Sequence, residues 1–136
     1  KHAEFMIEAY EKIIGSAVSR HILAMAHPFD AVCCPYDRQI LYKIISDDTY
    51  KRLFSATAEK GIAVEINTSC FKGITTDNFE QLGAIRMFRI AREMGCRFTF
   101  GSDSHSESGH DDYLYIAGTL IEGLSIKEDD MAEAVR

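Results

Sequence analysis

Three short apolar segments of this chain each end in side chains that can bind a metal ion or move a proton. The segments are HILAMAHP at 21–28, GIAVEINTS at 61–69 and FTFGSDSHS at 98–106. Each has the length of a buried strand that closes on a polar break. Because the carboxyl ends of parallel strands meet at one edge of a sheet, where α/β folds place their sites, we expect these polar residues to gather there.

Asp103 and His105 are the most suggestive pair, because they lie two residues apart at a strand end. In an extended chain such side chains point to the same side, so a carboxylate and an imidazole are presented together. This pair suits a divalent metal or acid–base chemistry. The spacing alone leaves open a polar turn in which Asp103 caps the next helix.

The other two strand ends supply His27, Glu65 and Asn67. Pro28 is expected to hold His27 extended, and a lone histidine is more often a structural hydrogen-bonding group than a ligand. Glu65 lies inside an apolar run and needs a partner or a metal, whereas Asn67 can donate to an anion. Lys72 can meet a phosphate, although solvation at the surface is the commoner fate of a lysine.

Apolar residues at three- and four-residue steps predict helices around these strands. Four of the predicted helices cover residues 3–18, 40–45, 78–94 and 112–123. Another helix is expected to start at a cap at Asp47 or Asp48 and to end before Gly61. A final short helix would start at a capping box formed by Ser125 and Glu128. Strands separated by helices indicate right-handed crossovers and a parallel sheet in an α/β fold. Three strands leave two unpaired edges, which favours part of a barrel over a finished doubly wound fold and predicts self-association.

The same spacing predicts which side chains of the helices face the core. They are Phe5, Met6, Tyr10, Ile13, Ile14 and Ala17 in the first helix, Ile40, Leu41, Ile44 and Ile45 in the second, Tyr50, Leu53, Phe54 and Thr57 in the third, Phe79, Leu82, Ile85, Phe88, Ala91 and Met94 in the fourth, and Tyr113, Leu114, Ala117, Leu120 and Ile121 in the fifth. The final strand is expected to start after Gly95.

The composition indicates one globular domain and argues against nucleic acid or a membrane as its partner. The 136 residues are 46% hydrophobic, which is enough for a single core. The net charge is −6 and there is no Lys/Arg run, which argues against sequence-independent nucleic-acid binding because that depends on phosphate neutralisation. No apolar stretch reaches the length of a membrane span, and the N-terminus has no signal-peptide pattern.

The four cysteines, Cys33, Cys34, Cys70 and Cys96, contain no CxxC pair, so neither a disulfide nor a cysteine-based zinc site is expected. Cys70 and Cys96 are expected to be small core residues in a reducing compartment, which indicates the cytoplasm. The sequence begins at Lys1 rather than Met and opens on a helical pattern, so we expect it to come from a longer protein.

Taken together, AMAHPFD, GIAVEINTSCFK and FTFGSDSHS resemble the C-terminal half of the PHP (polymerase and histidinol phosphatase) superfamily, in that order and at similar separations. The EINTS segment and the helix EAYEKIIGSAV look most like the histidinol-phosphatase branch. The resemblance implies an α/β fold that is the C-terminal portion of a distorted (β/α)7 barrel. It also implies two or three divalent metal ions, commonly zinc, manganese or iron, and hydrolysis of phosphate esters.

By this resemblance His27, Asp103 and His105 would be metal ligands, and Asp103 and His105 would also serve catalysis. Glu65 and Asn67 would shape the substrate site. Lys72 lies near the place of a basic phosphate-binding residue in family members.

Two departures from the family pattern limit what these residues can do alone. Gly73 stands where some relatives carry a further histidine ligand, and the family's N-terminal His-x-His has no counterpart in the sequence. A metal held by one or two protein ligands binds weakly. The 136 residues alone are therefore expected to bind metal poorly and to be inactive.

The sequence thus predicts a metal-dependent phosphoesterase of PHP type, whose partner is a small phosphorylated substrate such as histidinol phosphate. Two alternatives stay open. One is a non-catalytic interaction or regulatory module derived from the PHP scaffold. The other is a PHP nuclease or proofreading domain, against which the acidic charge argues.

Overall fold

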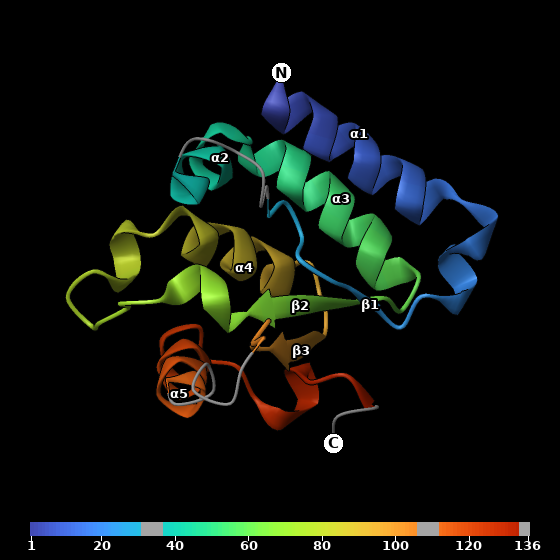
Figure 1. Ribbon diagram of the computed structural model, residues 1–136. Helices are drawn as coiled ribbons and strands as arrows, with labels where there is room; N and C mark the ends of the chain where they lie inside the picture. The colour runs from blue at the N-terminus through green and yellow to red at the C-terminus, as the bar shows by residue number, and fades with distance from the viewer. Residues whose placement is uncertain (31–36, 106–111, 134–136) are drawn as a thin grey trace.

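The structure is a computed structural model that describes residues 1–30, 37–105 and 112–133. Its centre is a parallel sheet of three strands in the order β1-β2-β3 (Figure 1). The strands are β1 (Ala24–Met25), β2 (Ala63–Asn67) and β3 (Phe98–Gly101). β1 and β3 both pair with β2 in parallel, which confirms the predicted parallel sheet.

Five α-helices surround the strands in the described part of the chain. They are α1 (His2–Gly15), α2 (Arg38–Ile44), α3 (Asp47–Glu59), α4 (Gly83–Glu93) and α5 (Tyr113–Gly123), with short 3₁₀ helices η1 (Ala17–His21), η2 (Thr68–Phe71), η3 (Phe79–Gln81) and η5 (Glu128–Asp130). Figure 1 shows α1 to α4 gathered on one side of the strands and α5 on the opposite side. The mixed α/β class is therefore confirmed. That the chain is the C-terminal portion of a (β/α)7 barrel stays a prediction.

The core is built around β2, which is the central strand. Val64 and Ile66 are fully buried, as expected for a strand covered on both faces. An aromatic cluster packs α1 and α3 together: Tyr10 stacks on Phe29 with ring centroids 4.7 Å apart, and Phe54 meets both rings edge-on. The Tyr10 hydroxyl also shares a 2.9 Å hydrogen bond with Thr57, so the one polar atom of this ring is satisfied inside the core.

The helix ends follow local rules, with one correction. Ser46, rather than Asp47 or Asp48, caps α3, because its hydroxyl accepts the Thr49 N–H at 3.2 Å. The two aspartates occupy the first turn, where negative charge is favourable. Gly61 has a positive φ of 68° just past α3, as the predicted helix end requires.

Several expected boundaries are wrong. The helix predicted at 78–94 is divided, because η3 precedes α4, which starts only at Gly83. The first helix stops at Gly15 and a 3₁₀ turn follows, so the strand starts at Ala24 and His21 does not begin it. The predicted capping box of Ser125 and Glu128 is absent from the described residues. The Lys127 N–H instead donates to the Asp130 carboxylate at 2.9 Å, which fixes the start of η5.

The inward faces of α3 and of the segment around α4 are confirmed, but those of the outer helices are narrower than expected. Phe5 and Leu114 are exposed at 67% and 79%, and further side chains predicted to be buried are also exposed, namely Ile13, Ala17, Ile40, Ile44 and Ile121. α1 and α2 pack against the other helices and lie away from the sheet, so only a thin stripe of each is covered. No described helix is long and apolar enough to cross a bilayer.

Candidate functional site at the carboxyl edge of the sheet

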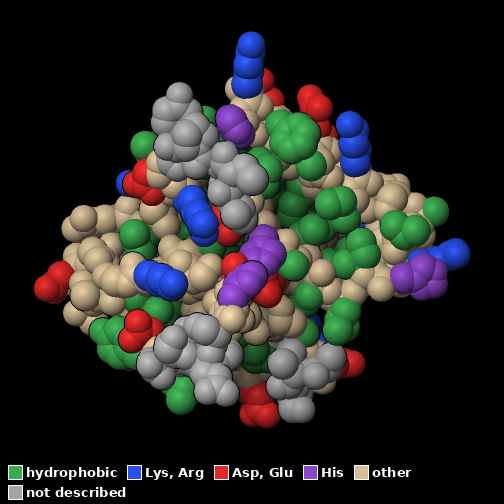
Figure 2. Space-filling model, viewed as in Figure 1, with side chains coloured by type: hydrophobic (Ala, Val, Ile, Leu, Met, Phe, Trp, Pro, Cys, Tyr) green, Lys and Arg blue, Asp and Glu red, His purple; other side chains and the backbone are tan. Residues whose placement is uncertain are grey.

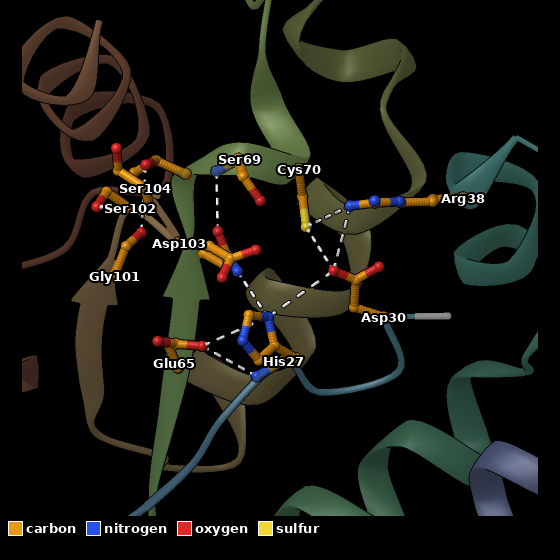
Figure 3. A network of polar contacts seen from close by, with 12 residues as sticks. His27, Asp30, Arg38, Glu65, Ser69, Cys70, Gly101, Ser102, Asp103 and Ser104 are labelled. Atoms are coloured by element: carbon orange, nitrogen blue, oxygen red, sulfur yellow. Dashed lines mark hydrogen bonds and ion pairs between the residues drawn. The ribbon is translucent and has the colours of Figure 1, made fainter. Parts of the chain in front are cut away.

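The three polar strand ends lie at one edge of the sheet. Asn67 ends β2 directly opposite Gly101 of β3, and Met25 ends β1 beside Val64. The polar residues that follow these strands therefore emerge together, as Figure 3 shows for the labelled side chains around the carboxyl-terminal half of β2. This agrees with the expected grouping of strand ends in a parallel sheet.

His27 is held by two contacts with β2. Its backbone N–H donates to Oε2 of Glu65 at 3.0 Å, and its ring Nδ1 lies 2.6 Å from the side-chain nitrogen of Asn67. The backbone φ of His27 is +48°, so the expected extended conformation before Pro28 is wrong. A left-handed conformation is unfavourable for a residue other than glycine, and the hydrogen bond to Glu65 helps to stabilise it here.

Glu65 has the partner that its place in an apolar strand requires. Its side chain is 20% exposed, and it accepts the His27 N–H. Gly101 on the neighbouring strand leaves the room for it, because a Cβ at Gly101 would overlap Oε1 of Glu65. Because Gly101 of β3 has no side chain, the Glu65 carboxylate of β2 can reach the end of β1.

Asp103 and His105 stay together, but not for the reason predicted. β3 ends at Gly101, and Asp103 has a φ of +49°, so the pair does not sit on an extended strand. Nε2 of His105 nevertheless lies 3.6 Å from Oδ1 of Asp103. The side chains are 90% and 42% exposed, which leaves both donors open to solvent.

A buried polar cluster lies beside His27 and was not predicted. The Asp30 side chain is 2% exposed, and its Oδ2 meets the Arg38 guanidinium and the Cys70 thiol, each at 3.3 Å (Figure 3). The phenol of Tyr42 also donates to the Cys70 sulfur, at 3.9 Å. Oδ1 of Asp30 has no hydrogen-bond partner among the described residues. The signal in the sequence was a carboxylate directly after the apolar segment 21–29, at a strand end like those that supply His27 and Asn67.

This cluster makes Cys70 a poor nucleophile. Burial and then the negative charge of Asp30 raise the pKa of the Cys70 thiol to about 11. The pKa of the buried Tyr42 phenol is raised as well, by burial and by Cys70 and Asp30. Cys70 was expected to be a small core residue; it is a partly buried, neutral thiol that donates to Asp30.

Two hollows adjoin at this edge, and Cys70 lines both. The smaller, of about 10 Å³, lies between His27, Asp30 and Glu65 and has the size of one water molecule. The larger is open, about 500 Å³, and is lined by Lys72 and Asp103. In Figure 2 histidine side chains lie at the centre of the face viewed, with acidic side chains beside them and Lys or Arg side chains to their left.

The predicted ligands do not complete a metal centre. Among residues 1–30, 37–105 and 112–133, no group of three His, Cys, Asp or Glu side chains is arranged to hold a metal ion. Asp103 and His105 form an open pair, whereas Nδ1 of His27 is already occupied by Asn67. These side chains are thus, at most, part of a larger donor set.

The comparisons with known proteins leave the family open. No protein-family model matches the chain, and no curated protein or solved structure is significantly similar to it.

Most of the predicted site residues are brought into one region. His27, Glu65 and Asn67 are in direct contact, and Asp103 and Lys72 face the hollow that adjoins them. Cys33, Cys34 and Ser106 lie outside the described residues.

Proposed function

We propose that this chain carries part of the active site of a metal-dependent phosphoesterase of the PHP type, which hydrolyses a small phosphomonoester such as histidinol phosphate. The observation that supports it best is the gathering of His27, Asn67 and Asp103 at one edge of a parallel sheet. These are the residues in which the chain resembles the superfamily. Cys70 lines both hollows, so we treat the two hollows as parts of one site.

The open hollow suits a small phosphorylated molecule. Its volume of about 500 Å³ lies in the usual range for small-molecule sites. Lys72 contributes a cation to its wall and Ser69 a hydroxyl, and both are ordinary phosphate partners. The chain's net charge of −6 makes a polynucleotide a poor substrate for the same hollow.

The Asp103–His105 pair is the reactive part of the proposal. An exposed carboxylate and imidazole 3.6 Å apart can exchange protons with a bound ester or complete the ligand set of an ion. Because the described donors are too few to hold a metal, the remaining ligands would come from outside them. The free thiols of Cys70 and Cys96 fit a reducing compartment, and the proposal places the protein in the cytoplasm.

Phosphate release by the natural protein that carries this sequence tests the proposal. Phosphomonoesters, histidinol phosphate among them, are supplied with Mn²⁺ or Zn²⁺. We expect hydrolysis of at least one ester, and a loss of at least about 100-fold in kcat/KM for Asp103→Asn and for His105→Asn. The 136 residues alone are expected to show no turnover.

His21→Asn is the matched control, since His21 is exposed in η1, where its Nε2 accepts a hydrogen bond from the Arg20 side chain. It should leave hydrolysis unchanged. A natural protein that hydrolyses none of the esters, or an Asp103→Asn variant with full activity, would overturn the proposal.

A further inference from the structure

The amide of Asn67 is fixed in one orientation by the backbone. Its Oδ1 accepts the Ser69 N–H at 2.9 Å, at the start of η2. The side-chain nitrogen must then face the other way, where it lies 2.6 Å from Nδ1 of His27. Rotating the amide by 180° would leave the Ser69 N–H facing a second donor. Asn67 is 3% exposed, so water does not replace the lost bond.

The contact with Asn67 decides which ring nitrogen of His27 carries the proton. An amide N–H₂ group is a donor only, so Nδ1 can meet it only as an acceptor. A neutral imidazole that accepts at Nδ1 carries its proton on Nε2.

Two neighbouring carboxylates weakly favour the other tautomer, in which Nδ1 carries the proton. Oδ2 of Asp30 and Oε2 of Glu65 both lie 3.9 Å from Nδ1, where a proton on Nδ1 would be attracted to them. That distance is beyond a hydrogen bond, whereas the Asn67 nitrogen is well inside one. Glu65 is also engaged already, because it accepts the backbone N–H of His27.

We propose that Asn67 is a positioning residue that keeps His27 in the tautomer protonated at Nε2. His27 then presents a hydrogen-bond donor to the site instead of a bare nitrogen for a metal ion. Within the described part of the chain Nε2 makes no hydrogen bond, and the side chain is 36% exposed. Its N–H is therefore free to donate to a ligand oxygen.

The role of this donor rests on the proposed function. In a phosphoesterase, Nε2–H of His27 donates to a phosphate oxygen of the substrate, beside the hollow that Lys72 lines. His27 is then a substrate-binding group, which departs from the ligand role that the family resemblance implies. The tautomer itself depends only on the contacts of Asn67.

Imidazole nitrogen NMR tests the tautomer directly. The ¹⁵N-labelled chain is measured at a pH where the imidazoles are neutral, and couplings to the ring carbon protons assign Nδ1 and Nε2. A bare nitrogen and a protonated one resonate far apart, so we expect Nδ1 of His27 to be bare and Nε2 to be protonated. The reverse assignment would overturn the proposal.

Asn67→Asp supplies the reciprocal test. A carboxylate at position 67 still accepts the Ser69 N–H and can accept a hydrogen bond from a protonated Nδ1, so the tautomer should switch. The freed Nε2 should then raise the affinity for Co²⁺ by about 10-fold, measured by titration of the metal alone. Asn78→Asp is the matched control: it makes the same charge change at a residue that bonds Thr75 and Gly73 instead of His27.

These measurements distinguish a failure to fold, an incorrect tautomer and an incorrect proposed function. If Asn67→Asp fails to fold, the wild-type tautomer still decides the question. If Asn67→Asp folds and keeps the proton on Nε2, the proposal is wrong. A natural protein without phosphatase activity would remove the proposed function and the substrate role of His27, while the tautomer assignment would stand.

Discussion

The backbone N–H of His27 donates to Oε2 of Glu65 at 3.0 Å, across 38 positions of sequence. This bond ties the end of β1 to the interior of β2. It gives a charged residue in an apolar strand the partner that it needs, and it helps to stabilise the left-handed conformation of His27. The third strand takes part through Gly101, which leaves the space that the Glu65 carboxylate fills.

Gly101→Ala should therefore disturb the site while leaving the fold intact. The new Cβ would overlap Oε1 of Glu65, which is the far end of a flexible side chain and can move away. We expect the His27 amide proton to lose its hydrogen bond, seen as a large change in its NMR shift and faster hydrogen exchange. The free energy of unfolding should fall by only about 1 kcal/mol.

Gly118→Ala in α5 is the control for that change, because a Cβ there meets nothing within 4 Å. It should raise the free energy of unfolding by up to about 1 kcal/mol through helix propensity, with the His27 amide unchanged. A Gly101→Ala variant with an unaltered His27 amide would show that Glu65 does not hold this strand end.

The Cys70 thiol should react slowly with alkylating reagents. Burial and the charge of Asp30 raise its pKa from 9.0 to about 11, so at pH 8 its thiolate fraction falls by about 100-fold relative to the unfolded chain. Peptide mass spectrometry after iodoacetamide treatment measures this at Cys70 itself. Asp30→Asn removes the charge and should increase the rate several-fold.

Asp77→Asn is the matched variant, since Asp77 is exposed and does not contribute to the raised pKa of Cys70. It should leave the alkylation rate of Cys70 unchanged. Equal rates in the folded and urea-unfolded chains would contradict the buried cluster.

The free energy of unfolding should decline above pH 9. Burial raises the pKa of both described thiols, to about 11 for Cys70 and about 12 for Cys96. The unfolded chain releases these protons from about pH 9, whereas the folded chain keeps them, so stability is complete below pH 9 and is lost as pH rises to about 12. Urea titrations across this range measure the effect.

Replacing Cys70 and Cys96 together by Ala should move the onset of this decline to about pH 10. Above that pH the buried phenols of Tyr10 and Tyr50 take over, because burial raises their pKa values from 10.0. An unchanged onset in the double variant would show that the thiols do not cause the decline.

Arg86→Lys should weaken the junction between α2 and α4. The Arg86 guanidinium donates to the carbonyls of Tyr42 at 2.8 Å and Ile45 at 2.6 Å, and it pairs with Asp47. A lysine ammonium cannot span these acceptors, so we expect a loss of about 1–2 kcal/mol in urea unfolding. Arg52→Lys, in an exposed pair with Glu11, should change stability by less than about 0.5 kcal/mol. Equal effects of the two changes would contradict the proposed bridging role.

The sheet and its polar edge followed from the sequence because they depend on local pattern. Each strand is a short apolar run that ends in polar residues, and parallel pairing then brings those ends together. The buried faces of α3 and α4 follow from the helical period in the same way. The predicted burial of Phe5 and Leu114 was wrong, because periodicity identifies an apolar face but does not show whether another element covers it.

The details of the site could not be read from local pattern. The positive φ values of His27 and Asp103 contradict the extended conformation that Pro28 and the i, i+2 spacing predicted. The His27 N–H bonds a carboxylate 38 positions away, a contact that local pattern does not predict. Asp30 and Cys70 meet across 40 positions, and no spacing rule connects them.

Mn²⁺ binding tests most directly whether the carboxyl edge of the sheet is the functional site of this chain. Small amounts of Mn²⁺ are added to the ¹⁵N-labelled protein, and the loss of amide signals is followed by residue. We expect residues 101–105 and 67–69 to broaden first, because Asp103 and His105 are exposed donors, and Asp103→Asn should suppress this effect. Broadening that starts instead at the acidic turns of 47–48 or 128–130, or that is uniform over the chain, would contradict a site at this edge.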